Sequence, residues 1–412
     1  MGGTAADATA ANPYDGFMRP TAPGLTRPLT DPSFYAGDPF PLYARLRAEA
    51  PFVWHDDPGF WVASTYDDVM RISKDPETFC SGKGVLLMDL GRELPEIPGA
   101  LLYVDPPDHT RYRRIVQPAF APSRVKALEP AIRAQARKLL DALPEGEVVD
   151  LVEAVAVPFP LVVIAELLGV PAEDWRRFYE WSDHAIAAGT RQTDENMAAL
   201  AEMAEFFLGV IAEKQRHPGD DLVSVLATVE VDGERLNDGE LMMFCGQLLV
   251  AGNETTRNLV SGGLVALAEH PDQWARLRAD RTLVPSAVEE LLRWTTPVIS
   301  FFRTATREVT IHGQRVHAGD PVMLLYASAN RDEAAFGPTA GQLDVARDPN
   351  QQVAFGFGQH YCLGAALARL EGRVMLEEIL DRFEELELVG EPGRLESAGV
   401  VSGWTSVPMI LR

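Results

Sequence analysis

Cysteine and long apolar runs are scarce in this sequence. Its three cysteines, at positions 80, 245 and 362, are too few for a disulfide framework, and no CxxC pair indicates a zinc site. No apolar run is long and unbroken enough to cross a membrane, and residues 1–24 lack the basic start and apolar core of a signal peptide. We therefore expect a cytoplasmic protein, since such cysteine usage fits the cytosol.

Positive charge is in short supply as well. The 412 residues carry a net charge of −23, which favours solubility and argues against nucleic acid as a partner. No internal repeat, phosphate-binding glycine loop or Pro/Gly/Ser linker is visible, and 46% of the residues are hydrophobic, enough for a large core. We expect one domain over residues 31–412, preceded by a flexible segment over residues 1–30.

Helical periodicity dominates the chain. It predicts helices at 38–50, 65–74, 285–294 and 365–383, and over much of 123–215. The stretch 237–270 is apolar almost all round, which predicts a buried helix of roughly 50 Å. Alternation at 52–62 and 307–326 predicts short strands, and residues 80–104 read as a long apolar loop. The expected fold is mainly α with small β-sheets.

A glycine-rich stretch joins an apolar run to the last predicted helix: Phe355-Gly356-Phe357-Gly358-Gln359-His360-Tyr361-Cys362-Leu363-Gly364. Its glycines allow a sharp turn and close approach to a flat partner. The start of a helix favours a thiolate at Cys362, and a thiolate can ligate the iron of an oxygen-activating haem. For Cys362 alone, a small buried cysteine is the plainer interpretation. As a whole, the decamer resembles the haem-binding signature of the cytochrome P450 family.

The long predicted helix contains a second motif, Ala251-Gly252-Asn253-Glu254-Thr255-Thr256. An acid and an alcohol are unusual in a buried helix, although Glu254 could pair with Arg257 and Thr255 could bond to the carbonyl four residues earlier. The motif resembles the family's oxygen-activation motif. That resemblance implies that Glu254 and Thr255 organise water and deliver protons to dioxygen, that Ala251 contacts the haem, and that Gly252 leaves room for oxygen.

Further basic residues match positions that contact the haem in this family. His109 and Arg113 follow Asp105-Pro106-Pro107 and share one helix face; a solvated basic turn is the alternative. The resemblance implies that these two, with Arg303 and His360, bind the haem propionates, a pairing that charge-assisted hydrogen bonds would favour. It also places the remaining haem contacts in the decamer, at Phe355, Gly356 and Gly364.

Glu290-Leu291-Leu292-Arg293 places an acid and a base on one helix face. Alone, an ExxR pair is weak, because many solvated helices contain one. Here it resembles the family's ExxR motif, and the resemblance implies that Arg331 completes a buried Glu-Arg-Arg network behind the haem. The role of these three residues would be structural.

The resemblance extends over nearly the whole chain after about residue 30. It implies a single large triangular, mainly α domain with small β-sheets, in which haem b lies buried between the long central helix and the cysteine-bearing loop. The implied activity is that of a haem-thiolate monooxygenase. Such an enzyme inserts one oxygen atom from O2, by hydroxylation or epoxidation, into an apolar small molecule such as a steroid, fatty acid, terpenoid or polyketide.

The chain has no flavin or iron–sulfur motif of its own. The resemblance to soluble bacterial members therefore implies electrons from a ferredoxin and an NAD(P)H-dependent ferredoxin reductase, and we expect a monomer. An acidic ferredoxin should dock on a face made basic by Arg111, Arg114, Arg369 and Arg373. Two other interpretations stay open: a non-catalytic haem-binding sensor or carrier, and a peroxide-driven haem enzyme.

Overall fold

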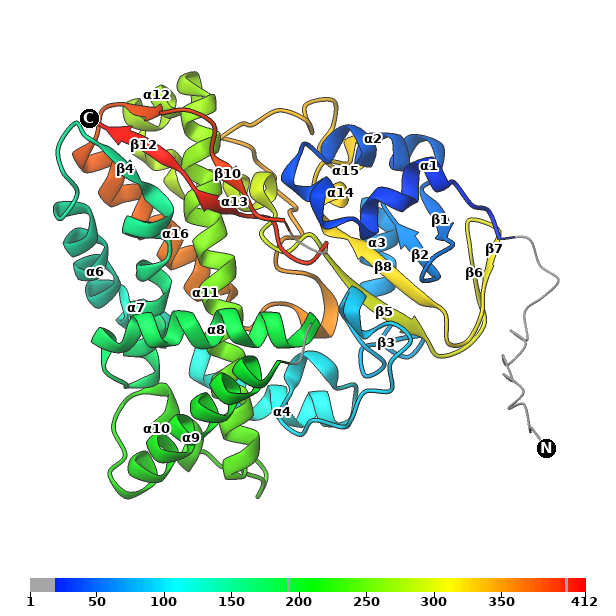
Figure 1. Cartoon of the computed structure of the whole chain (residues 1–412), viewed down its shortest axis with the longest axis horizontal. Coiled ribbons are helices and arrows are strands. Elements are labelled where there is room, and N and C mark those ends of the chain that lie inside the picture. Colours follow the sequence, from blue (N-terminus) through cyan, green and yellow to red (C-terminus); the bar gives the residue numbers. More distant parts are fainter. Residues whose placement is uncertain (1–18, 191–192, 397–398) are drawn as a thin grey trace, which may run out of the picture.

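The computed structural model describes residues 19–190, 193–396 and 399–412. Most helices gather on one side of the molecule, and the largest sheet lies on the other with α1, α2 and α3 (Figure 1). The helices are α1 Pro23–Thr26, α2 Phe40–Glu49, α3 Tyr66–Ser73, α4 Asp108–Val116, α5 Pro122–Ala127, α6 Glu129–Asp141, α7 Pro158–Leu168, α8 Trp175–Thr190, α9 Asp194–Arg216, α10 Leu222–Thr228, α11 Asp238–Glu269, α12 Pro271–Ala279, α13 Val284–Thr295, α14 Tyr326–Ala329, α15 Glu333–Phe336 and α16 Ala365–Arg382.

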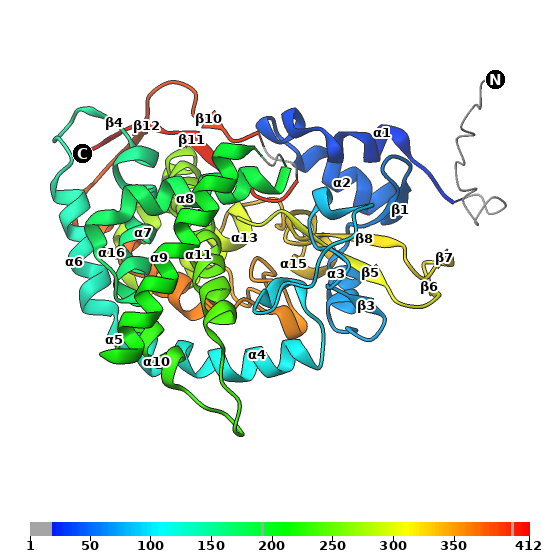
Figure 2. The same ribbon diagram turned by 60° about the horizontal axis from the view of Figure 1, so that its bottom comes forward.

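Helix α11 runs through the helical part and organises it (Figures 1 and 2). Asn237 caps its start: the Asn237 side chain accepts from the Glu240 N–H at 3.0 Å, and the Glu240 carboxylate accepts from the Asn237 N–H at 2.9 Å. The helix packs against α7, α9, α13 and α16, and most of its side chains are buried. The prediction of a long buried helix is thus confirmed. No described helix, α11 included, is both long and apolar enough to cross a membrane.

The strands form one larger and three small sheets in the described residues: β1 Phe52–His55, β2 Phe60–Ala63, β3 Phe79–Cys80, β4 Val148–Asp150, β5 Ser300–Ala305, β6 Val309–Ile311, β7 Gln314–Val316, β8 Pro321–Leu325, β9 Leu386–Leu388, β10 Gly393–Arg394, β11 Trp404–Ser406 and β12 Pro408–Leu411. The larger sheet has the order β1-β2-β8-β5-β3. The predicted hairpin at 52–62 is its β1–β2 pair, and β2 pairs in parallel with β8, where Trp61 lies opposite Val322.

The N-terminal segment is more ordered than its composition indicates. Residues 1–18 of the segment predicted to be flexible lie outside the described residues, but Leu25 and Leu29 are buried in α1 and the turn after it. Arg19 stacks 3.7 Å over the ring of Trp54 and pairs with Asp320 at 2.9 Å. The folded domain therefore begins before residue 31, because these two leucines belong to the core around the sheet.

Candidate functional site

Residues 353–364, here called the cysteine loop, lead into α16. The Cys362 N–H donates to the Phe355 carbonyl at 2.9 Å, and the Gly356 N–H donates to the Val353 carbonyl at 2.9 Å. Gly358 has a φ of +74° and packs so closely on the Ser73 carbonyl that a side chain there would collide with it. Both glycines of the Phe-Gly-Phe-Gly run thus serve the turn, as the sequence predicts.

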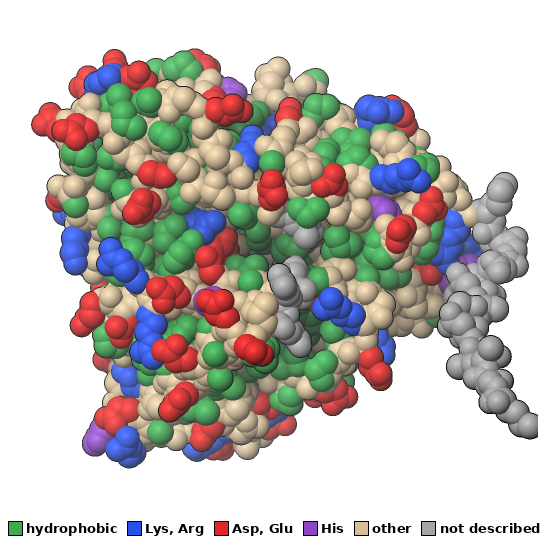
Figure 3. All heavy atoms as spheres, viewed as in Figure 1, with side chains coloured by type: hydrophobic (Ala, Val, Ile, Leu, Met, Phe, Trp, Pro, Cys, Tyr) green, Lys and Arg blue, Asp and Glu red, His purple; other side chains and the backbone are tan. Residues whose placement is uncertain are grey.

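The Cys362 side chain faces an enclosed space. It has exposed surface, yet desolvation raises the pKa of its thiol, against the opposing effects of the Gly364 N–H, Arg113 and Arg369. A side chain that lines an internal hollow is accessible and desolvated at once. Figure 3 shows the molecule hollowed between its helical part and its sheet part. A separate surface depression of about 790 Å³, bordered by α6, α7 and α8, contains none of the predicted site residues.

One stripe of α11 also retains exposed surface in the middle of an otherwise buried helix. Gln247, Ala251 and Thr255 are exposed or half-buried, and they follow one another at four-residue spacing, so they share one face. Their neighbours Asn253 and Glu254 are buried. The stripe therefore faces the hollow, and it includes Ala251 and Thr255, the residues predicted as a haem contact and an oxygen-site alcohol.

Gly252 does not lie on this stripe. A Cβ at Gly252 would stand 2.7 Å from Cδ1 of Ile164 in α7. The glycine lets α11 and α7 approach each other, and the prediction that it leaves room for oxygen is wrong.

Glu254 and Thr255 each form a hydrogen bond with a residue three or four positions away on the same helix. The Thr255 hydroxyl donates to the Ala251 carbonyl at 2.8 Å, so its oxygen is left to accept a hydrogen bond from the hollow. The Glu254 carboxylate accepts from Arg257 at 2.9 Å. Desolvation raises the pKa of Glu254, partly offset by Arg257, and Asp183 of α8 adds to the rise. Glu254 is therefore a buried acid between the exposed stripe and α8.

A second buried acid, Glu371 of α16, was not predicted from the sequence. The Thr256 hydroxyl donates to one of its oxygens at 3.2 Å, and the other oxygen has no hydrogen-bond partner in the described residues. Burial raises the pKa of Glu371 to about 8. The sequence could have indicated this residue, because an acid between Leu370 and Val374 lies on the apolar face of the last helix, where its carboxylate must be buried.

The predicted propionate-binding residues form a cluster rich in nitrogen donors. The rings of His109 and His360 lie 4.3 Å apart, and His360 Nε2 lies 3.0 Å from the Ser81 hydroxyl. Desolvation, with Arg303, His109 and Arg113, lowers the pKa of His360 to about 2. Desolvation and Arg113 lower the pKa of His109 to about 4. The structure thus brings together residues from α4, β5 and the cysteine loop, as predicted.

This cluster fits an anionic group. His109 Nε2 is buried without a hydrogen-bond partner, and no acidic side chain of the described residues forms an ion pair with Arg113 or Arg303. Four nitrogen donors without a paired carboxylate suit the two propionates of a haem. Arg113 of this cluster acts electrostatically on Cys362, whose side chain is accessible, so these residues together fit a haem held through Cys362.

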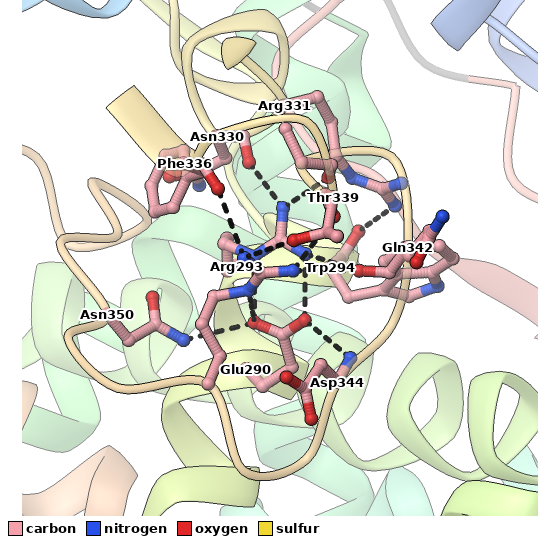
Figure 4. Close-up of polar contacts among 12 residues, drawn as sticks. Glu290, Arg293, Trp294, Asn330, Arg331, Phe336, Thr339, Gln342, Asp344 and Asn350 are labelled. Atoms are coloured by element: carbon pink, nitrogen blue, oxygen red, sulfur yellow. Dashed lines mark hydrogen bonds and ion pairs between the residues drawn. The ribbon is translucent and has the colours of Figure 1, made fainter. Parts of the chain in front are cut away.

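The ExxR motif forms a buried network (Figure 4). The Glu290 carboxylate accepts from Arg293 Nη2 at 2.7 Å and Nε at 2.8 Å, and both side chains are wholly buried. It also accepts from Arg347 Nε at 3.0 Å, from Asn350, and from the Asp344 N–H. The network ties α13 to the loop that precedes the cysteine loop.

The second arginine on Glu290 is Arg347, so the prediction that Arg331 completes the network is wrong. Arg331 stacks 3.4 Å over Trp294 and 4.2 Å over Phe40, and donates to the Trp294 carbonyl at 3.1 Å. Burial and Arg293 lower the pKa of Arg331 to about 9. Arg347 reaches Glu290 because the chain after α15 folds back over α13, a return that no local spacing encodes.

The predicted basic docking face is largely neutralised. Each of the four predicted arginines forms an ion pair: Arg111 with Glu240 at 3.1 Å, Arg114 with Asp232 at 2.9 Å, Arg369 with Glu289 at 2.5 Å, and Arg373 with Glu129 at 2.7 Å. Lys74, Arg124 and Lys126 are exposed and pair with no acidic side chain of the described residues. Lys74 lies 5.0 Å over the ring of Phe357 in the cysteine loop, and α5, which carries the other two, packs against α16.

Comparison with known proteins gives one consistent result. Residues 169–403 match the family model described as Cytochrome P450. The chain is 40% identical over 390 residues to a steroid C26-monooxygenase of Mycobacterium tuberculosis, covering 93% of this chain and 96% of the relative. It is 36% identical over 396 residues to linalool 8-monooxygenase of Pseudomonas putida, covering 90% and 96%. The solved structure of CYP108D1 from Novosphingobium aromaticivorans matches with a TM-score of 0.86 and 37% identity, over 96% of this chain and 100% of that chain.

Proposed function

Because this chain belongs to the cytochrome P450 family, it is a haem-dependent monooxygenase, and we propose that it hydroxylates an apolar steroid-like or terpenoid molecule. The observation that carries the substrate class is the similarity to relatives named for steroid and linalool oxidation. Val298 and Val401, which are half-buried and pair backbone to backbone, and the exposed Ala251 of α11 are apolar side chains that suit an apolar ligand.

The cofactor that this site would hold is haem b, which the Cys362 thiolate would ligate and which would supply the activation of O2. His109, Arg113, Arg303 and His360 would donate to its propionates. Phe355, Gly356, Gly364 and Ala251 are the remaining predicted haem contacts.

Thr255 and Glu254 handle protons beside the hollow. The Thr255 hydrogen is engaged by the Ala251 carbonyl, so the oxygen accepts a hydrogen bond from a water and orients it. Glu254 passes protons from the side of α8, where Asp183 is exposed and raises the pKa of Glu254. The raised pKa suits a group that must take up and release a proton.

The electron donor is a ferredoxin served by an NAD(P)H-dependent ferredoxin reductase, and it docks on the cations that lack an acidic partner. The positive charge of each ion-paired arginine is largely cancelled by its acidic partner, so it attracts a distant acidic protein only weakly. Lys74, Arg124 and Lys126 have no acidic partner among the described residues, so their charge is not cancelled. Lys74→Glu should slow reduction by an acidic ferredoxin and reduce its salt dependence, and Arg373→Glu should do so less. A larger effect of Arg373→Glu would overturn this assignment.

The test of the function uses the haem-loaded protein and Cys362→Ser. The parent's reduced carbon monoxide complex should show the long-wavelength band of thiolate ligation, and the serine variant should lose it. With a ferredoxin and reductase, the parent should convert a steroid or terpenoid to a hydroxylated product. Product from peroxide alone would favour a peroxide-driven enzyme. Substrate binding without turnover under either condition would favour a sensor or carrier.

A further inference from the structure

Thr296, directly after α13, has an unusual backbone conformation. Its φ of 40° and ψ of 72° lie in the left-handed region, which a β-branched residue rarely adopts. Its buried hydroxyl donates to the Arg293 carbonyl at 2.8 Å and accepts from the Asn330 side chain at 2.9 Å. Such a conformation persists only where neighbouring contacts hold it, and it is found at functional sites.

Asn330 uses both ends of its side-chain amide. The residue is wholly buried; Nδ2 donates to Thr296, and Oδ1 accepts from the Val353 N–H at 2.8 Å. Val353 is the first residue of the cysteine loop, and its carbonyl receives the Gly356 N–H. One amide therefore joins the end of α13 to the loop that carries Cys362.

On its other side, Thr296 directly precedes residues 297–300, which lead into β5 and so to Arg303 of the donor cluster. Residues 297–300 bind residues 399–402 through three backbone-directed contacts: the Ser402 N–H donates to Pro297 at 2.9 Å, the Ile299 N–H donates to Val400 at 2.8 Å, and the Ser300 hydroxyl donates to the Gly399 carbonyl at 2.7 Å. These two segments are here called the cavity wall, and the first of them starts directly after the strained residue that Asn330 holds.

We propose that Asn330 is a positioning residue that fixes the cavity wall and the cysteine loop relative to each other through the Thr296 hydroxyl. Loss of that hydroxyl frees the turn before the wall and leaves the Asn330 Nδ2 group buried without an acceptor, so the wall and the loop shift together. The inference rests on the proposed thiolate ligation by Cys362 and adds to it the pair Thr296 and Asn330, which are not among the predicted site residues.

The experiment compares Thr296→Val with the parent as haem-loaded proteins. Valine keeps the size and the branch but lacks the hydroxyl. Two quantities are measured: the share of the long-wavelength band in the reduced carbon monoxide complex, and the dissociation constant of 4-phenylimidazole from its spectral shift. We expect the band share to fall and the dissociation constant to rise about threefold to tenfold, as for one net hydrogen bond. Thr296→Ser, which restores the hydroxyl, should return both to parental values.

Thr295→Val is the matched control, since the Thr295 hydroxyl only bonds back to the Leu291 carbonyl at 2.7 Å. It should leave both quantities unchanged. Thr296→Gly is a second test variant that adopts the left-handed conformation without strain and should behave like Thr296→Val. Weaker 4-phenylimidazole binding with unchanged bands, or equal effects of Thr295→Val, would overturn the inference. Absence of the long-wavelength band from the parent would instead refute the thiolate assignment itself.

Discussion

Replacement of Arg347 by methionine should destabilise the protein far more than the same replacement of Arg331. Arg347 binds Glu290 at 3.0 Å and the carbonyls of Thr339 and Gln342 at 2.9 and 3.1 Å, and it is only 8% exposed. Removal of one member of a buried ion pair costs about 3–5 kcal/mol. Arg331 offers one carbonyl contact and two ring contacts, and a methionine can still pack on Trp294, so its loss costs about 1–2 kcal/mol.

These costs convert into melting temperatures. With an unfolding entropy of about 2.1 cal/mol/K per residue, the 412 residues give about 0.9 kcal/mol per degree. Arg347→Met should therefore lower the melting temperature of the haem-loaded protein by about 3–6 °C, and Arg331→Met by about 1–2 °C. Circular dichroism measures both, with haem content as a second measure. Arg347→Lys keeps the charge but loses the planar guanidinium group, so its melting temperature should lie between those of the parent and the methionine variant. A larger loss for Arg331→Met would refute the network described here.

Three further outcomes are expected. Thr255→Ala should keep haem binding and NAD(P)H consumption but release peroxide in place of product, whereas Thr255→Ser should keep the parental yield of product per NAD(P)H. A substitution of the adjacent Thr256 does not serve as a control, because the Thr256 hydroxyl binds Glu371. Glu371 keeps its proton in the folded state up to a pH of about 8 but loses it at its ordinary value of 4.5 when unfolded, so it makes stability fall as the pH rises between these values. Glu371→Gln should therefore gain stability relative to the parent from pH 5 to 8 and no further above pH 8, as urea unfolding would measure; a constant difference would contradict the raised pKa. Leu29→Ala should cost about 2–5 kcal/mol in the same assay, whereas a silent substitution would mean that the N-terminal segment does not contribute to the core.

The features that the sequence predicts correctly are those encoded over a few neighbouring residues. The buried helix that begins near Asn237 and the glycines of the cysteine loop both depend on residues within one or two turns of chain. Ala251 and Thr255, which the resemblance places at the haem, lie on one face of α11 because they are four residues apart, and both keep accessible surface.

The errors concern contacts between distant segments. Arg331 and Arg347 both follow the ExxR helix, and only the fold-back of the chain after α15 decides which one meets Glu290. Glu371 meets Thr256 across two helices that are 115 residues apart at this point. The Gly252 error has the same cause: a glycine within a motif does not reveal which neighbouring helix it allows to approach.

The parallel pairing of β2 with β8 has a consequence for synthesis of the protein. About 260 residues separate Trp61 from its partner Val322. At about 5–20 residues per second, a ribosome needs roughly 13–50 s to deliver β8 after β2 has emerged. During that time the residues of β2, all buried in the finished protein, form an unpaired apolar edge next to β1. The sheet side of this enzyme is therefore the part of the nascent chain that stays open to wrong pairing until β8 has emerged.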